Sequence, residues 1–197
     1  MSAPGPQRAS GGGQTTWETP PALFDQLDYE FRFTLDAAAS ESNRKCERYI
    51  TKEEDALRAD ISQEIVWCNP PYGRGLKKWC TAFAAWSIKG STVVALLPDA
   101  TDTEWFARVW FWAHEIRLLT GRVNFVGSRG GNTSGSIIAI YRPQPLVFLP
   151  ARPGDPEVIV RNVVPPRVSL WDWRATSHHV RNPVINTRIM RQRRTEP

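Results

Sequence analysis

Two short apolar runs, each stopped by proline, restrict the fold of this chain more than any other feature. Ile65–Cys68 is followed by Asn69-Pro70-Pro71, and Thr92–Leu97 is followed by Pro98. Apolar runs of this length, rich in β-branched residues, are typical of buried strands. Between them, residues 76–88 repeat apolar side chains at helical spacing. This order predicts a strand, a crossover helix and a second strand parallel to the first.

The rest of the first 142 residues extends the same alternation. We predict a helix beginning near Thr19, a strand over residues 31–35 ended by Asp36, a helix over 102–112, and strands over 115–119, 123–126 and 136–141. The predicted fold is therefore α/β, with a mostly parallel sheet and helices on both faces. Ligands of such sheets bind beyond the carboxyl ends of the strands, so Asp36 and Asn69 should lie on one rim.

Composition divides the chain into three predicted parts. Residues 1–14, rich in Gly, Pro and Ser, are predicted to be disordered, and residues 15–142 to form the catalytic domain. Residues 143–197 hold nine of the sixteen prolines and are predicted to be an extension rather than more sheet, although Glu157–Val160 and Leu170–Trp173 could form short strands or docked segments.

Charge is unevenly distributed along the chain. Residues 1–142 contain 16 basic and 16 acidic residues, whereas residues 143–197 contain nine arginines and four acids, which is the whole net charge of +5. An arginine-rich segment suits contact with the phosphates of a nucleic acid, and a merely solvated tail explains it equally well.

Several classes of protein are disfavoured by the sequence. No apolar run approaches the roughly 20 residues that span a bilayer, and residues 1–13 do not resemble a secretory signal. Cys46, Cys68 and Cys80 are scattered, so neither a disulfide framework nor a metal site is predicted. A reducing cytoplasm is the expected compartment.

The tetrapeptide Asn69-Pro70-Pro71-Tyr72 has a specific chemical use at the end of a strand. The two prolines stiffen the loop. The Asn69 side-chain oxygen and the Pro70 carbonyl can accept the two hydrogens of one exocyclic amino group, and Tyr72 offers a ring for stacking. The pattern favours methyl transfer to the amino group of a base, although the same residues also occur in ordinary loops.

With these residues placed, the chain resembles the phage-type DNA N6-adenine methyltransferases. The resemblance covers residues 16 to about 142 and rests on Trp17-Glu18-Thr19-Pro20, Phe33–Ala39, Glu53–Leu57, Trp67–Gly73, Leu96-Leu97-Pro98, Asp102–Phe106 and Gly121–Phe125. It implies a Rossmann-like methyltransferase fold that uses S-adenosylmethionine, double-stranded DNA as substrate, and a phage or prophage product in a bacterial cytoplasm.

The resemblance also implies residues that contact the cofactor. Asp36 would lie near its methionine end, with Thr19 and Pro20 beside the amino acid group, and Asp55 would accept a hydrogen bond from its adenine. Each has a structural alternative: Asp36 as a turn cap, Thr19 as a helix cap, and Asp55 as a solvated acid. The glycine turn common after the strand-end acid is replaced by Ala37-Ala38-Ala39-Ser40, where a positive φ is not expected.

On the substrate side, the resemblance implies an adenine flipped out of the duplex and methylated by direct in-line displacement. Asn69 and the Pro70 carbonyl would hold the N6 amino group, and Tyr72 would stack on the base. Phe125 is a second stacking candidate, with packing as its alternative. Arg122 and Arg129 are predicted DNA contacts, although the Gly/Ser-rich loop that holds Arg129 could equally be an ordinary surface loop.

Other readings of the sequence remain open at this point. Cys68 is predicted to be a core residue rather than a nucleophile, because no histidine lies near it in the sequence. The same tetrapeptide would serve a methyltransferase acting on RNA or on a protein glutamine. A nucleic-acid-binding protein that kept the fold without catalysis is the alternative from another class, and cofactor binding separates it from the enzymes.

Overall fold

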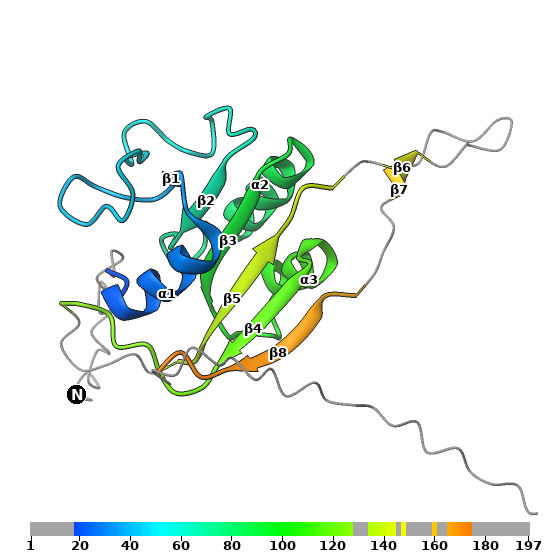
Figure 1. Ribbon diagram of the computed structural model, residues 1–197. Coiled ribbons are helices and arrows are strands. Elements are labelled where there is room, and N and C mark those ends of the chain that lie inside the picture. Colours follow the sequence, from blue (N-terminus) through cyan, green and yellow to red (C-terminus); the bar gives the residue numbers. More distant parts are fainter. Residues whose placement is uncertain (1–17, 128–133, 145–146, 149–158, 161–164, 175–197) are drawn as a thin grey trace, which may run out of the picture.

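A six-stranded sheet forms the centre of the molecule (Figure 1). The computed structural model describes residues 18–127, 134–144, 147–148, 159–160 and 165–174. The strands lie in the order β1-β2-β3-β5-β4-β8. Their bounds are β1 Leu35–Asp36, β2 Ile65–Cys68, β3 Thr92–Pro98, β4 Glu115–Leu119, β5 Ser136–Tyr141 and β8 Arg167–Trp171. A separate antiparallel pair consists of β6, Val147–Phe148, and β7, Ile159–Val160.

The sheet is mostly parallel, as predicted. β1 pairs with β2, β2 with β3, and β4 with β8, all in parallel. β5 lies between β3 and β4 and is antiparallel to both. All strands of this sheet except β5 therefore point the same way, and β1 and β2 end on one rim.

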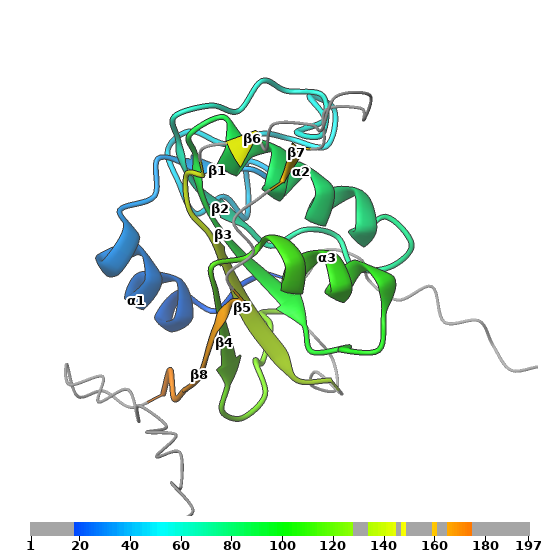
Figure 2. The same cartoon turned by 90° about the vertical axis from the view of Figure 1, so that its right-hand side faces the viewer.

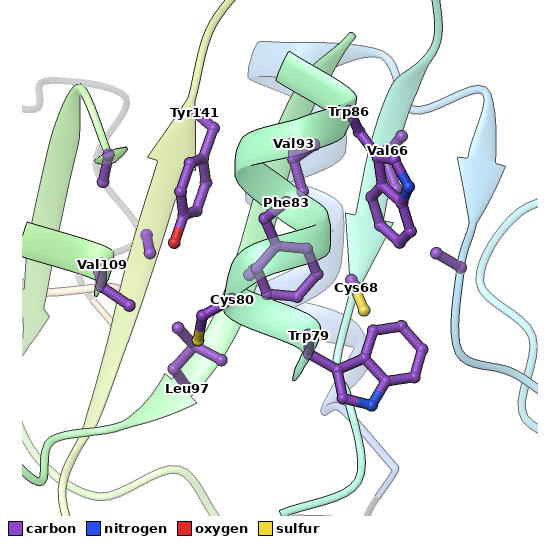
Figure 3. Close-up of a cluster of buried hydrophobic side chains, with 14 of the residues drawn as sticks. Val66, Cys68, Trp79, Cys80, Phe83, Trp86, Val93, Leu97, Val109 and Tyr141 are labelled. Carbon is purple, nitrogen blue, oxygen red and sulfur yellow. The ribbon is translucent and has the colours of Figure 1, made fainter. Parts of the chain in front are cut away.

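Helices cover both faces of the sheet, which confirms the predicted layers (Figure 2). α1, Pro21–Phe31, lies on one face. α2, Leu76–Ile88, and α3, Glu104–Trp112, lie on the other. The alternation of side chains along each strand divides the core accordingly. On β2, for example, Trp67 packs on the α1 side while Val66 and Cys68 pack on the α2 side (Figure 3).

The start of the chain folds differently from the prediction. α1 is capped by Pro20 instead of Thr19 and continues to Phe31, where Arg32 takes a left-handed conformation and ends the helix. The predicted strand over residues 31–35 is therefore wrong for its first residues. The alternation of Phe31 and Phe33 reflects two stacked rings, 5.9 Å apart, and the strand begins only at Leu35.

Two further predictions on strands are wrong. Residues 122–125 belong to neither a helix nor a strand, and Val126 forms only an isolated bridge with Glu18. The expectation that residues after 143 add nothing to the sheet also fails, because β8 is its outermost strand and pairs with β4 along Glu115–Leu119. Trp171 and Trp173 are buried in the core on the α1 side, so the possibility of a short docked strand near Leu170–Trp173 is confirmed.

The predicted helix over residues 102–112 begins slightly later than expected. Thr103 caps α3, and its hydroxyl accepts a hydrogen bond from the Phe106 amide at 3.3 Å. In the described part of the chain, we find no helix with the length and apolarity needed to cross a membrane.

Candidate active site

A cavity of about 1220 Å³ opens at the rim where β1 and β2 end. Its walls bring together eight residues that the sequence singled out: Thr19, Asp36, Ala37, Asp55, Asn69, Pro70, Pro71 and Tyr72. Pro20, Arg122 and Phe125 are not among the residues that line it, and Arg129 lies outside the described residues. The cavity exceeds the usual volume of a site for one drug-sized ligand.

The Asn69–Tyr72 loop is held firmly at both ends. Before it, β2 is paired with β3 up to Cys68 and is buried from Val66 onward. Pro70 is buried as well. After it, Gly73 has a φ of +123°, which favours glycine, and its carbonyl accepts a hydrogen bond from the Leu76 amide at the start of α2. The sheet and α2 thus fix where the loop can present its oxygens.

Tyr72 is anchored by its hydroxyl. The phenol donates a hydrogen bond to the Leu96 carbonyl on β3 at 3.3 Å. Burial raises the pKa of Tyr72 well above its usual value, so the phenol stays protonated and serves as a donor rather than a base. The hydroxyl thereby fixes the ring in the wall of the cavity.

Phe125 lies behind Tyr72 instead of lining the cavity. Its side chain is only 3% exposed, and its ring meets that of Tyr72 edge-to-face with centroids 6.3 Å apart. Of the two roles that the sequence left open for Phe125, this geometry favours packing over stacking on a base, because a buried ring offers no face to a ligand. Phe125 supports the aromatic residue that does line the cavity.

Asp36 is the most deeply buried acid among the described residues that line the cavity. Its carboxylate accepts hydrogen bonds from the amides of Ala38 and Lys45 at 3.2 and 3.0 Å. Burial raises the pKa of Asp36 above its usual value, while these two amides and the charge of Lys45 oppose the rise. Asp36 therefore organises the turn, and it also lines the cavity.

The loop after Asp36 has the regular backbone expected of a segment without glycine. None of residues 37–40 has a positive φ. The Ala37 amide donates to the Trp67 carbonyl at 2.9 Å, and the Ala39 amide donates to the Ile50 carbonyl at 3.1 Å. Three alanines in succession line the cavity. These small side chains leave room for a ligand to approach the backbone although glycine is absent.

An ion pair in the cavity wall was not predicted from the sequence. Lys45 Nζ lies 3.0 Å from Glu18 Oε1, and the Lys45 side chain is 13% exposed. Both residues line the cavity beside Thr19 and Asp36. No sequence spacing signals this contact, because it joins the segment before α1 to the loop after β1.

Asp55 adopts a left-handed conformation, with φ of 53°, at the far side of the cavity. Its carboxylate accepts a hydrogen bond from the Leu57 amide at 3.2 Å and pairs with Arg58 at 3.2 Å. Asparagine and aspartate tolerate this conformation better than other side chains. The acid is therefore structured rather than simply solvated, and it still lines the cavity.

Cys68 is a core residue, as predicted. Its side chain is fully buried among Val66, Trp79 and Phe83 (Figure 3). Burial raises the pKa of its thiol well above the usual value, which keeps it protonated and unreactive. In the described ranges, no group of three or more His, Cys, Asp or Glu side chains is arranged to hold a metal ion.

Comparison with known proteins adds to this geometry. Residues 11–153 match the model of the family described as DNA N-6-adenine-methyltransferase (Dam). A DNA N-6-adenine-methyltransferase of Haemophilus phage HP1 is 31% identical over 136 residues, which is 65% of this chain and 79% of the phage protein. The protein of that name from Escherichia phage T1 is 30% identical over 152 residues, 64% of this chain and 62% of the relative.

A solved structure is also similar, but only distantly. It is a predicted O-methyltransferase from Agrobacterium tumefaciens, with a TM-score of 0.37 and 13% sequence identity over 76% of this chain and 83% of that chain. A similarity of this size has no bearing on the function of the cavity.

Proposed function

Since the chain belongs to the DNA N-6-adenine-methyltransferase (Dam) family, we propose that its cavity binds S-adenosylmethionine beside an adenine flipped out of double-stranded DNA. The single observation that supports this most is the meeting of Asp36 and Asn69 in one cavity, each at the end of a parallel strand. The carboxylate of Asp36 suits the cationic cofactor, and the side-chain oxygen of Asn69 suits the amino group of the adenine.

The residues that line the cavity fit the cofactor chemically. S-adenosylmethionine, when bound, supplies a methyl group on a positively charged sulfur. Asp36 provides a buried negative charge for a cationic ligand. The Ala37–Ala39 backbone leaves room beside it, and Asp55 is available for the amino group of the cofactor's adenine. Thr19 also lines the cavity and lies beside the proposed position of the amino acid group of the cofactor. Pro20, in contrast, is the N-cap residue of α1.

Lys45 and Glu18 extend this fit to the amino acid end of the cofactor. That end carries both a carboxylate and an ammonium group. The Lys45 ammonium suits the carboxylate, and Glu18 keeps Lys45 directed along the cavity wall. Asp36, whose carboxylate is held by the Lys45 amide, suits the ammonium group. One short stretch of chain thereby complements a zwitterion.

On the substrate side, the chain positions the methyl acceptor. The Asn69 side-chain oxygen and the Pro70 carbonyl each accept one hydrogen of the adenine N6 amino group. Accepting both hydrogens leaves the nitrogen lone pair directed away from the loop and favours tetrahedral geometry at nitrogen. Tyr72 stacks on the extruded base, which lowers the cost of unstacking it. Positioning and fixed dipoles supply the acceleration, with no covalent enzyme intermediate.

The test is transfer of labelled methyl groups from S-adenosylmethionine by the purified full-length chain to double-stranded DNA. Nucleoside mass spectrometry should then find N6-methyladenine, and little or none in single-stranded DNA, RNA or protein offered in parallel. Label in RNA or on a protein glutamine would replace the DNA substrate. Binding of DNA without any binding of S-adenosylhomocysteine would point to a non-catalytic protein.

A further inference from the structure

The C-terminal strand is tied to the strip of chain that leads to the active site. β8 runs alongside β4, and the Thr120 amide, just past β4, donates to the Trp171 carbonyl at 3.0 Å. Two residues later the Trp173 carbonyl accepts a hydrogen bond from Gln26 of α1 at 2.6 Å. The end of the described chain is therefore fixed between the sheet and α1.

Arg174 continues this contact onto the next turn. Its Nη2 donates to the Arg122 carbonyl at 2.6 Å, and its guanidinium lies 5.3 Å from the centre of the Trp173 ring. Gly121 has a φ of +77°, and a Cβ added there would come within 2.6 Å of Arg174 Nη1. The guanidinium thus lies against a turn where only glycine leaves it room.

The other end of the same strip forms part of the cavity. We call residues 120–127 the wall strip. Phe125 supports Tyr72 from behind. Val126 and Gly127 line the cavity, and the Val126 amide donates to the Glu18 carbonyl at 3.0 Å. Among the described residues, the strip is joined to other strand-like segments at its two ends only, by the Thr120 hydrogen bond to β8 and by the bridge at Val126. Contacts outside a ladder therefore set the position of the residues between them.

We infer that Arg174 is a positioning residue for the wall strip, acting through Phe125 on the Tyr72 side of the cavity. The inference rests on the proposed function for its link to DNA, but its structural core is independent of activity. Arg174 touches no residue on the Asp36 side among its described contacts. Its loss should therefore impair the handling of DNA and leave cofactor binding nearly unchanged.

The variants to compare are Arg174→Ala, Arg174→Lys and, as the matched control, Arg167→Ala at the other end of the same exposed strand. Hydrogen exchange of the wall strip gives a readout without activity: exchange should speed up in Arg174→Ala but not in Arg167→Ala. The kcat/KM for DNA should fall about 10-fold in Arg174→Ala, since small misplacements of a reacting group cost that much or more. Affinity for S-adenosylhomocysteine should change less than about twofold.

A double-mutant cycle with Phe125→Leu tests the route of the effect. If Arg174 acts through Phe125, Arg174→Ala should cost little more in the Phe125→Leu background, because the two changes disturb one unit. Additive losses would overturn the inference, as would equal exchange rates in Arg174→Ala and Arg167→Ala.

A direct contact between Arg174 and a DNA phosphate is the competing explanation. It predicts that Arg174→Ala makes the slope of log K for DNA binding against log salt concentration shallower by about 1, the contribution of one phosphate contact. Arg174→Lys should restore that slope. Positioning predicts an unchanged salt slope and only partial rescue by lysine, whose ammonium cannot reproduce the planar contact with Trp173. Should the wild-type chain methylate no DNA, the proposed function fails, while the exchange rates still decide whether Arg174 holds the strip.

Discussion

Asn69 illustrates how a single side chain in the site depends on its neighbours. Cys68 before it is locked in the sheet, Pro70 after it is buried, and Gly73 turns the chain into α2. We expect Asn69→Ala to reduce kcat by at least about 10²-fold, as removal of one fixed polar contact does in other enzymes. Binding of S-adenosylhomocysteine and the free energy of unfolding should stay close to wild type. Retained turnover in this variant would remove the proposed role of Asn69.

Lys45 should contribute to the recognition of one end of the cofactor only. A hydrogen bond to a charged group contributes about 1.5–3 kcal/mol. Lys45→Met should therefore lower the affinity for S-adenosylhomocysteine by about tenfold or more. Methylthioadenosine, which lacks the amino acid group, should bind both forms equally. Calorimetry with both ligands measures the difference. Equal losses for the two ligands would show that Lys45 merely supports the cavity.

Asp36 should make cofactor binding sensitive to pH. Its pKa is raised by burial, and the cationic ligand prefers the ionised carboxylate. Affinity for S-adenosylmethionine should therefore fall as the pH drops through this raised pKa, at a higher pH than for an ordinary aspartate. For the same reason, ionised Asp36 costs the unliganded fold some stability at neutral pH, and protonation relieves that cost. Titration calorimetry from pH 8 downward checks this, and Asp36→Asn should bind weakly with no such decline.

Among the candidate site residues, the sequence placed in one cavity those that directly end or follow a strand. Asp36 and Asn69 do so. The apolar run located β2 correctly, whereas the alternation over residues 31–35 placed the start of β1 too early. Lys45 and Glu18 could not be found in this way, because their contact depends on how two loops cross in space. For Phe125 the sequence left stacking and packing both open, because a ring beside a site and a ring behind one have the same sequence signature.

At the scale of elements, local pattern succeeded for uniform apolar runs and for clear helical periodicity, and it failed where short alternation between polar and apolar residues was the signal. α2, β3 and β5 appear where their patterns predicted them. The residues around Phe31 and Phe33 alternate like a strand, but Pro20 and Pro21 start a helix that continues to Phe31. The strip at residues 123–126 has strand-like residues but is held by tertiary contacts, which no local pattern reveals.

β8 should be an integral part of the fold. Trp171 is buried beneath Arg117, whose guanidinium lies 5.5 Å from the centre of that ring and pairs with Glu30 of α1. Trp171→Ala should lower the free energy of unfolding by about 3–5 kcal/mol, as loss of a large buried ring does. Leu170→Ala on the same strand is the control. Its side chain is 59% exposed, so a change within about 0.5 kcal/mol is expected. Urea unfolding of both variants decides the matter.

At the scale of the whole molecule, charge and fold can be separated by truncation. Residues 175–197 contain five arginines and one acid, so removing them should weaken DNA binding. The slope of log K for DNA binding against log salt concentration should also become shallower, by about 0.9 for each phosphate that these arginines neutralise.

The chain ending at Arg174 should keep wild-type stability. A chain ending at residue 164 should lose it, because β8 and both tryptophans go with it. Equal melting temperatures for the two truncations would contradict the role assigned to β8.

The boundary of the catalytic domain near residue 142 remains a prediction, with β8 as an addition to it. Composition suggested the boundary because prolines become frequent there, and proline is a poor strand former. An outermost strand needs fewer ladder hydrogen bonds than an inner one, so a strand can follow such a stretch. Pairing between β4 and β8 joins residues about 50 positions apart, a contact that depends on the whole chain.

The place of β8 in the chain also bears on synthesis. The chain is synthesised from its N-terminus, so α1 and the strands that it covers leave the ribosome well before Trp171 and Trp173 can pack against them. Until those two rings are in place, the apolar side chains that they cover on the α1 side of the sheet are exposed, and other unfolded chains can bind to them. The α1 side of the core is therefore completed only after residues 167–173 have been synthesised.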